Sequence, residues 1–195
     1  AGAMLLVQSD GGGSLKAAQA EVEALGHFAQ AHGALDVAVS DDPADSAALV
    51  AMRRMAQPSF ERWAQAHGGG QLLDDVCLPR TRLPEFYDRL ETIRQESGLT
   101  IAVVAHAGDG NTHPSVFFDT SDPDSIARAD AAFDAIMEVG LELGGTITGE
   151  HGVGHLKRRW LARELDEGSR RAHLAVKAAL DPLGILNPGK MLAEL

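Results

Sequence analysis

The sequence is poor in cysteine, and Cys77 is the only one among its 195 residues. An intrachain disulfide needs two thiols, so none can form, and metal sites built from several thiolates are excluded as well. Long hydrophobic runs are also absent, because no segment approaches the roughly 20 apolar residues that cross a bilayer. The apolar residues 4–7 are too few for a signal peptide and lack a basic flank. We therefore expect a cytoplasmic protein without a transmembrane segment, with peripheral membrane association as the alternative for a longer parent protein.

Basic residues are few relative to acidic ones. Seventeen Lys and Arg residues oppose 28 Asp and Glu residues, which gives a formal net charge of −11. A surface of this sign repels phosphate backbones, so we expect no nucleic acid as a partner. Hydrophobic residues make up 45% of the chain, which is ordinary for a globular protein and sufficient for the core of one domain over residues 1–195.

Nucleotide-binding loops are missing too. Residues 184–190 begin like a phosphate loop, but Met191 stands where that loop needs Ser or Thr. Pro188 has no N–H to donate to a phosphate, and no strand–turn–helix segment carries a complete G-x-G-x-x-G motif. The sequence therefore predicts no dinucleotide bound in the Rossmann manner.

The hydrophobic pattern predicts an irregular alternation of strands and helices. Helical spacing of apolar residues predicts helices over residues 15–29, 83–97 and 123–143, and a last helix from an N-cap at Ser169 to Leu180. A helix through residues 49–56 should stop at Gln57, because Pro58 disfavours a helical residue before it. Apolar or alternating runs predict strands at residues 4–8, 35–39, 72–78, 100–105 and 115–118. We predict the α+β class, an antiparallel or mixed sheet with helices packed mainly on one face, of ferredoxin-like type.

Two histidines frame the loop that follows the most apolar strand. His106 and His113 enclose Ala-Gly-Asp-Gly-Asn-Thr, in which Gly, Asp and Asn favour a turn over a helix. A hairpin would bring His106, at one strand end, close to His113, at the start of the next strand, as two ligands of one metal ion require. The alternative is a polar turn whose histidines form only local hydrogen bonds.

A second polar segment, residues 149–155, reads Gly-Glu-His-Gly-Val-Gly-His. Its glycines indicate a sharply bent backbone or a close approach to another group. Glu150 and His151 offer a third metal ligand and a base from adjacent positions. Adjacent side chains point to opposite sides of an extended chain, so without a bend only one of them could ligate.

Three motifs, in order, resemble the C-terminal domain of FAD-linked oxidases. They are His-Ala-Gly-Asp-Gly-Asn-Thr-His at 106–113, Gly-Thr-Ile-Thr-Gly-Glu-His-Gly-Val-Gly at 145–154, and Leu-Asp-Pro-Leu-Gly-Ile-Leu-Asn-Pro-Gly-Lys at 180–190. The family includes the glycolate oxidase flavin subunit, flavin-dependent D-lactate dehydrogenases and D-2-hydroxyglutarate dehydrogenase. The likeness is specific over residues 99–192, whereas over residues 1–98 only the order of elements matches. It implies the substrate- and metal-binding domain of an FAD-dependent D-2-hydroxy-acid dehydrogenase, which oxidises a 2-hydroxy acid to a 2-oxo acid.

The resemblance also implies roles for individual residues. The ligands of a divalent metal would be His106, His113 and Glu150, with Zn²⁺ as the first choice and Mn²⁺ or Fe²⁺ as alternatives. His151 would be the general base. Arg53 would contact the substrate carboxylate, although the tryptophan that often precedes this arginine is missing, and a solvated helix arginine is the alternative. Asn187 would approach the flavin, the alternative being a plain turn residue.

The family holds its FAD mostly on a separate N-terminal domain, to which nothing in this sequence corresponds. The resemblance therefore implies that domain as a partner, an unidentified electron acceptor, a homodimer as one option, and an isolated chain that is inactive. Two rival hypotheses remain at this point. A metal-dependent hydrolase would use the same three ligands without a flavin, and a non-catalytic ferredoxin-like ligand-binding module would bind no metal.

Overall fold

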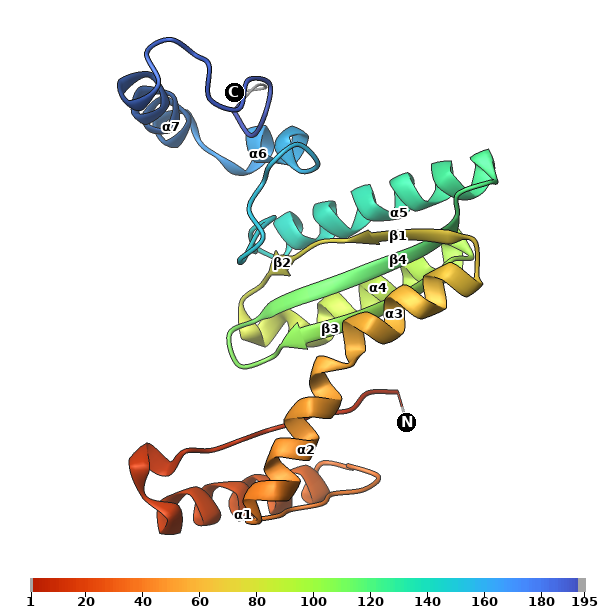
Figure 1. The fold of residues 1–195 in the computed structure, drawn as a ribbon, viewed down its shortest axis with the longest axis vertical. Helices are drawn as coiled ribbons and strands as arrows, with labels where there is room; N and C mark the ends of the chain where they lie inside the picture. The colour runs from red at the N-terminus through yellow and green to blue at the C-terminus, as the bar shows by residue number, and fades with distance from the viewer. Residues whose placement is uncertain (1, 193–195) are drawn as a thin grey trace. The chain divides into compact units, whose positions relative to one another are not determined.

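The computed structural model describes residues 2–192, and the chain divides into two compact units, Ala1–Phe60 and Glu61–Leu195. The first unit contains the short 3₁₀ helix η1 (Gly11–Gly13), α1 (Leu15–Ala31) and α2 (Pro43–Arg54), while α3 (Ala56–Ala66) begins in it (Figure 1). The side chain of Asp42 accepts a hydrogen bond from the Ala44 N–H, and Pro43 occupies the first turn of α2. This cap and proline are the usual start of a helix.

The strands predicted at residues 4–8 and 35–39 are wrong, because both segments lack regular structure. A single strand is stable only when it pairs with another one. The described residues of the first unit form no strand, and none of them is buried. These two apolar segments therefore have neither a hydrogen-bonding partner nor a core inside their own unit.

The helix predicted through residues 49–56, with its end at Gln57, is also wrong in its boundaries. The helix α2 ends at Arg54, Met55 forms its C-cap, and α3 starts at once at Ala56. Pro58 therefore lies in the first turn of α3, where backbone N–H groups have no partner within the helix. Proline costs no hydrogen bond at such a position, so it does not end the helix there.

The second unit contains a four-stranded antiparallel sheet whose central strand is β4 (Asn111–Asp119). The strands β1 (Gly69–Leu73) and β2 (Val76–Cys77) pair with one side of β4, and β3 (Thr100–His106) pairs with the other. The strand expected over residues 72–78 is thus interrupted at Asp74 and Asp75. Their carboxylates bind groups outside the sheet, as described below, so the backbone leaves the strand there.

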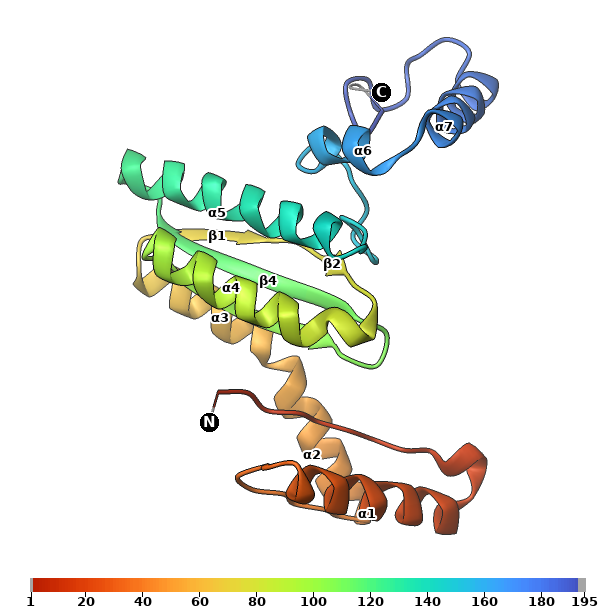
Figure 2. The ribbon, with the colours of Figure 1, turned by 180° about the vertical axis from the view of Figure 1, so that it is seen from behind.

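Two helices cover one face of this sheet. The helices α4 (Leu83–Ser97) and α5 (Pro123–Glu142) pack on it, and α4 lies in front of β4 in Figure 2. The core between the helices and the sheet is mainly apolar and includes Val76, Phe86, Val116, Phe133 and Ile136. Gly98 adopts the left-handed conformation with φ 64° and ends α4, as the sequence predicts. On the opposite face, Trp63 of α3 contacts Phe117 with ring centroids 4.8 Å apart.

The α+β prediction with helices mainly on one face is confirmed. The order of β1/β2, α4, β3, β4 and α5 follows the first five elements of the β-α-β-β-α-β pattern typical of ferredoxin-like folds. After α5 the chain returns to the sheet edge, where Thr146 forms a single antiparallel bridge with Cys77. This bridge stands in the place of the sixth element.

The C-terminal part contains α6 (Arg158–Glu164) and α7 (Glu167–Leu180). The sequence pattern did not predict α6, whose Trp160 packs against Phe133 with ring centroids 5.6 Å apart. The predicted cap at Ser169 is wrong, because Asp166 is the N-cap and its carboxylate accepts the Ser169 N–H. Among the helices of residues 2–192, none combines the length and apolar character needed to cross a membrane.

Candidate metal centre

The β3–β4 hairpin brings the two predicted histidines together. His106 is the last residue of β3 and pairs with Asn111, while His113 pairs with Val104. His113 follows Asn111 by two residues on β4, and side chains two residues apart on a strand share a face. Both imidazoles therefore lie on the same face of the sheet, the one opposite α4 and α5. Their ring centroids are 5.3 Å apart at an interplanar angle of 88°. His113 lies inside β4 rather than before it, because β4 begins earlier than the predicted strand at residues 115–118.

Gly110 makes the turn of this hairpin possible. Its φ of 88° lies in the left-handed region, and a Cβ there would lie 2.0 Å from the carbonyl oxygen of Leu78. The Asp109 carboxylate accepts the Asn111 N–H at 3.0 Å, which closes the turn. The Gly, Asp and Asn residues that excluded a helix therefore have direct structural roles in the turn.

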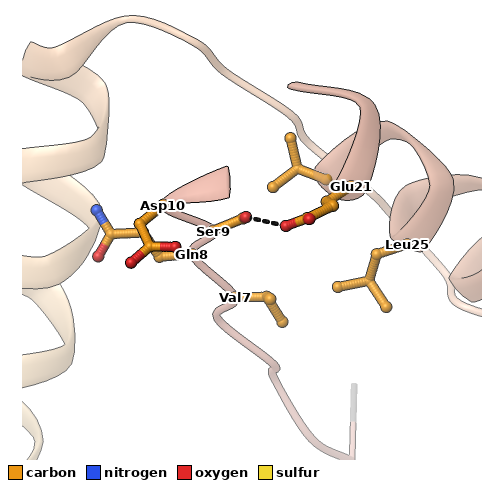
Figure 3. A pocket seen from close by; sticks show the side chains of 7 residues that line it. Val7, Gln8, Ser9, Asp10, Glu21 and Leu25 are labelled. Carbon is orange, nitrogen blue, oxygen red and sulfur yellow. Dashed lines mark hydrogen bonds between the residues drawn. The ribbon is translucent and has the colours of Figure 1, made fainter. Parts of the chain in front are cut away.

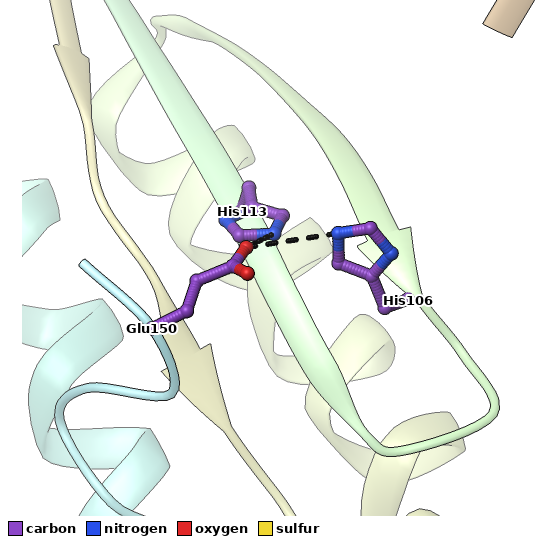
Figure 4. Close-up of side chains that lie close together, drawn as sticks. All are labelled: His106, His113 and Glu150. Carbon is purple, nitrogen blue, oxygen red and sulfur yellow. Dashed lines mark ion pairs between the residues drawn. The ribbon is translucent and has the colours of Figure 1, made fainter.

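Glu150 completes a three-residue cluster with the two histidines. Its Oε1 lies 3.0 Å from Nε2 of His113 and 3.6 Å from Nε2 of His106. Figure 4 shows the Glu150 side chain extending from its loop toward both imidazoles. One donor atom from each residue lies within 4.8 Å of the other two. Two ring nitrogens and a carboxylate oxygen at this spacing form a donor set that suits a divalent metal ion.

His151 reaches the same cluster because its loop is bent. Its ring stacks on that of His113 with centroids 4.9 Å apart, and its Nε2 lies 4.0 Å from Glu150 Oε1. On the other side of the ring, Nδ1 lies 3.4 Å from Asp74 Oδ1. Glu150 and His151 thus converge despite being adjacent, and Gly152 follows them with a φ of 79°.

The cluster is buried on one side and open on the other. His113 is 7% exposed, whereas the side chains of His106 and Glu150 are 49% and 53% exposed. Burial, together with the charge of His151, lowers the pKa of His113, and the Glu150 carboxylate opposes this shift only in part. A lowered pKa favours the neutral imidazole, which is the form that binds metal ions. The open side makes the cluster accessible from the solvent.

Two buried polar atoms at the cluster have no hydrogen-bond partner among the described residues, namely Asn111 Oδ1 and His113 Nδ1. Asn111 lies against the loop of Glu150, because a Cβ on Gly149 would be 2.4 Å from Asn111 Oδ1. The absence of a side chain at Gly149 thus allows the loop to approach the hairpin.

The loop of Glu150 and His151 is anchored on Asp75. Oδ2 of this buried carboxylate accepts hydrogen bonds from the N–H groups of Gly149, Glu150 and His151. Its Oδ1 lies 2.6 Å from Nζ of Lys157, which is also buried. Burial by itself raises the pKa of Asp75, but the hydrogen bonds from Lys157 and the loop N–H groups outweigh it and hold the pKa well below its usual range.

Sequence reasoning missed Asp74, Asp75, Lys157 and Asn111 as parts of this site. The pattern treated the two aspartates as members of a strand over residues 72–78. Adjacent carboxylates inside an apolar strand are a signal that could have been followed, since buried charges require partners. Nothing in the sequence around Lys157 indicates that this lysine is buried.

Two predicted site residues are not among the clustered side chains. Arg53 is half-buried in the last turn of α2, in the first unit, and Asn187 is exposed in a turn of the second unit with a φ of 49°. The Lys190 N–H donates to the Asn187 carbonyl and closes that turn. The roles of both residues stay predictions.

A different hollow lies in the first unit between the N-terminal segment and α1 (Figure 3). It is lined by Val7, Gln8, Ser9, Asp10, Glu21, Val22 and Leu25, and the Ser9 hydroxyl donates to Glu21. This lining includes neither histidine nor cysteine, so we place the candidate metal centre at the β3–β4 hairpin.

Comparison with known proteins gives the same family for nearly the whole chain. A family model described as FAD linked oxidases, C-terminal domain, matches residues 1–191. The chain is 34% identical to glycolate oxidase subunit GlcD of Bacillus subtilis over 98% of this chain and 40% of that protein. It is 33% identical to the mitochondrial D-lactate dehydrogenase [cytochrome] of Arabidopsis thaliana over 85% of this chain and 29% of that protein. The chain thus spans less than half the length of these curated relatives.

A solved structure also resembles the chain. It is a 4-ethylphenol oxidase from Gulosibacter chungangensis, with a TM-score of 0.46 and 23% sequence identity, over 63% of this chain and 24% of that one.

Proposed function

The chain belongs to the family of FAD linked oxidases, C-terminal domain, and from this premise we propose that it is the substrate- and metal-binding part of an FAD-dependent 2-hydroxy-acid dehydrogenase. Glycolate and D-lactate, which the names of its relatives contain, are both 2-hydroxy acids. The observation that carries the proposal is the convergence of Glu150 Oε1 on the Nε2 atoms of His106 and His113.

The donor set fits a divalent metal ion with nitrogen and oxygen preferences, such as Zn²⁺, Mn²⁺ or Fe²⁺. Two neutral imidazoles and one carboxylate leave such a site with a net charge of +1, which attracts the carboxylate of a substrate. When bound, the ion supplies a Lewis acid that lowers the pKa of the substrate hydroxyl. The exposed His106 and Glu150 border the open side, through which a small hydroxy acid would enter.

His151 is the residue that would accept the hydroxyl proton. Its Nδ1 faces the Asp74 carboxylate at 3.4 Å, and this arrangement favours a proton on Nδ1 and a free lone pair on Nε2. Nε2 is the ring atom directed toward Glu150, on the side of the proposed substrate. General-base catalysis is a usual role of a histidine held in this way.

The remaining parts of the reaction would involve groups outside the cluster. FAD, held by the N-terminal domain of such an enzyme, supplies the acceptor for the hydride that leaves C2 of the substrate. His151 would accept the hydroxyl proton and FAD would accept the hydride, so that the hydroxy acid would become a 2-oxo acid. Arg53 would bind the substrate carboxylate, Asn187 would lie next to the flavin, and a separate electron acceptor would reoxidise it.

Metal content tests the proposal directly. The chain purified after zinc supplementation should contain about one equivalent of zinc, and His106→Ala should lose most of it because a ligand is missing. His155→Ala is the matched control, since His155 is an exposed histidine outside the three-residue cluster. Equal zinc content in the wild type and in His106→Ala would contradict the assignment.

A further inference from the structure

A buried carboxylate distant in sequence from the metal-ligand candidates holds the backbone of their loop. Asp75 is fully buried. Its Oδ2 accepts the consecutive N–H groups of Gly149, Glu150 and His151 at 2.7, 2.5 and 3.0 Å. Its Oδ1 accepts a hydrogen bond from the Thr148 hydroxyl at 3.3 Å. Successive N–H groups that converge on one anion form a concave backbone nest, and here the anion is a side chain of the protein itself.

Lys157 compensates the charge of this carboxylate. Its Nζ lies 2.6 Å from Asp75 Oδ1, 2.6 Å from Asp74 Oδ1 and 3.3 Å from the Asp75 carbonyl oxygen. An ammonium group has three donors, and these three acceptors match them. Although Asp74, Asp75 and His151 have ligand atoms close enough for a metal ion, the ammonium group already lies between the two carboxylates. This second cluster is therefore an internal ion pair and not a second metal site.

We propose that Asp75 is a positioning residue that, with Lys157 as its counterion, sets the places of Glu150 and His151 at the metal centre. The proposal rests on the proposed metal-binding function. The glycine-rich loop lies outside helices and strands, so its backbone would lose much conformational freedom on becoming ordered. Fixing three consecutive N–H groups to one oxygen restrains the backbone from which the side chains of Glu150 and His151 project. The Glu150 carboxylate thereby lies next to His106 and His113, and the His151 ring lies next to Asp74.

A double variant, Asp75→Asn with Lys157→Met, tests this role. Removing one negative and one positive charge together leaves the net charge of the buried cluster unchanged, which makes folding more favourable than in either single variant. Asp74 then still faces Nδ1 of His151 at 3.4 Å. The neutral amide oxygen of Asn lacks the negative charge that strengthens the three convergent hydrogen bonds from the loop N–H groups, so it should hold them more weakly. Asp74→Asn is the matched control, because Asp74 contacts the same lysine, while the loop N–H groups bond to Asp75.

Two measurements on the 195-residue chain decide the proposal. Amide hydrogen exchange at residues 149–151, followed by NMR without metal, should be slow in the wild type and in Asp74→Asn, and much faster in the double variant. Zinc affinity, measured by competition with a chelator, should fall by about 10–100-fold in the double variant, as for other groups that orient metal ligands. The melting temperature shows whether the fold is retained, so that a loss of affinity is separated from unfolding.

Wild-type exchange rates at these amides in the folded double variant would overturn the proposal, and so would a zinc affinity within about twofold of the wild type. If the wild type bound no zinc, the metal-binding function would fail, while the exchange rates would still decide the positioning role. Should the double variant not fold, Asp75→Glu keeps the ion pair but moves the carboxylate by one methylene, and the same readouts apply. Faster exchange in Asp75→Glu supports the role, and unchanged exchange refutes it.

Discussion

The two adjacent residues Glu150 and His151 occupy different electrostatic surroundings at the cluster. Glu150 faces two imidazoles, which makes it suited to share a metal ion with them. His151 contacts the Asp74 carboxylate through Nδ1 and the His113 ring through stacking. A carboxylate that faces Nδ1 of a histidine favours a proton on that atom and leaves the lone pair on Nε2. The contacts of each residue thus support a ligand role for the first and a base role for the second.

The distinction predicts the behaviour of His151→Asn in a flavin-containing protein that includes this chain. The variant should keep its metal but lose on the order of 10²–10⁴ in the rate of 2-hydroxy-acid oxidation, which is the usual contribution of a general base. Metal content by elemental analysis and turnover with glycolate and D-lactate are the two measurements. His155→Asn should retain both properties. Loss of metal in His151→Asn would instead identify His151 as a ligand.

Among the secondary-structure elements, the approach of α5 to β2 depends on a residue without a side chain. A Cβ at Gly140 would lie 2.5 Å from Cγ1 of Val76, a fully buried residue of the core. Val76 directly follows Asp75, so the helix and the anchor of the metal-centre loop are adjacent in the structure. Close packing at this point therefore supports both the core and the site.

Gly140→Ala should consequently destabilise the chain by about 1–3 kcal/mol, the usual effect of inserting a group into a packed core. Gly168→Ala is the matched control, because its Cβ in α7 would lie 3.4 Å from Asp166 Oδ1, an ordinary contact. Because Gly168 lies in the first turn of α7, this substitution should change the stability by less than about 1 kcal/mol. Urea unfolding monitored by circular dichroism gives both values. Equal stability of the two variants would show that α5 and β2 can move apart without loss.

At the scale of the whole molecule, the candidate ligands come from three segments of the second unit. His106 ends β3, His113 belongs to β4, and Glu150 lies in the loop after α5. A metal ion bound to all three would link segments that separate on unfolding. Metal binding would therefore stabilise the folded second unit by an amount that grows with the logarithm of the free ion concentration divided by Kd.

Zinc should accordingly raise the melting temperature of the chain in a concentration-dependent way. At a free zinc concentration of 100 times Kd, the expected stabilisation is about 2.7 kcal/mol, less any binding to the unfolded chain. Thermal unfolding with zinc and with a chelator measures the difference. The shift should persist in His155→Ala and vanish in His106→Ala. A zinc-loaded wild type that melts at the temperature of the metal-free chain would argue against ligands from all three segments.

Local chemistry determined much of the fold and the identity of the candidate ligands. The helix boundaries predicted at residues 97 and 123 follow from interactions within a few residues, because Gly98 ends α4 and the Asp122 side chain caps α5 before Pro123. The apolar run over residues 100–105 similarly predicted β3. The two histidines and Glu150 were recognisable because each lies in a short motif with a distinct residue order. These features depend on neighbours along the chain, which a sequence displays directly.

Tertiary structure alone decided the features that join distant segments. Asp75 and Lys157 are 82 positions apart, and no local pattern pairs a particular aspartate with a particular lysine. The apolar segments at residues 4–8 and 35–39 look like strands, yet a strand exists only where another strand pairs with it. The bend that lets Glu150 and His151 converge depends likewise on the Asp75 carboxylate beneath their loop. Hydrogen bonding and charge pairing across long sequence separations are set by the folded arrangement. For this reason the sequence pointed to the candidate ligands but not to the carboxylate that holds the loop of Glu150.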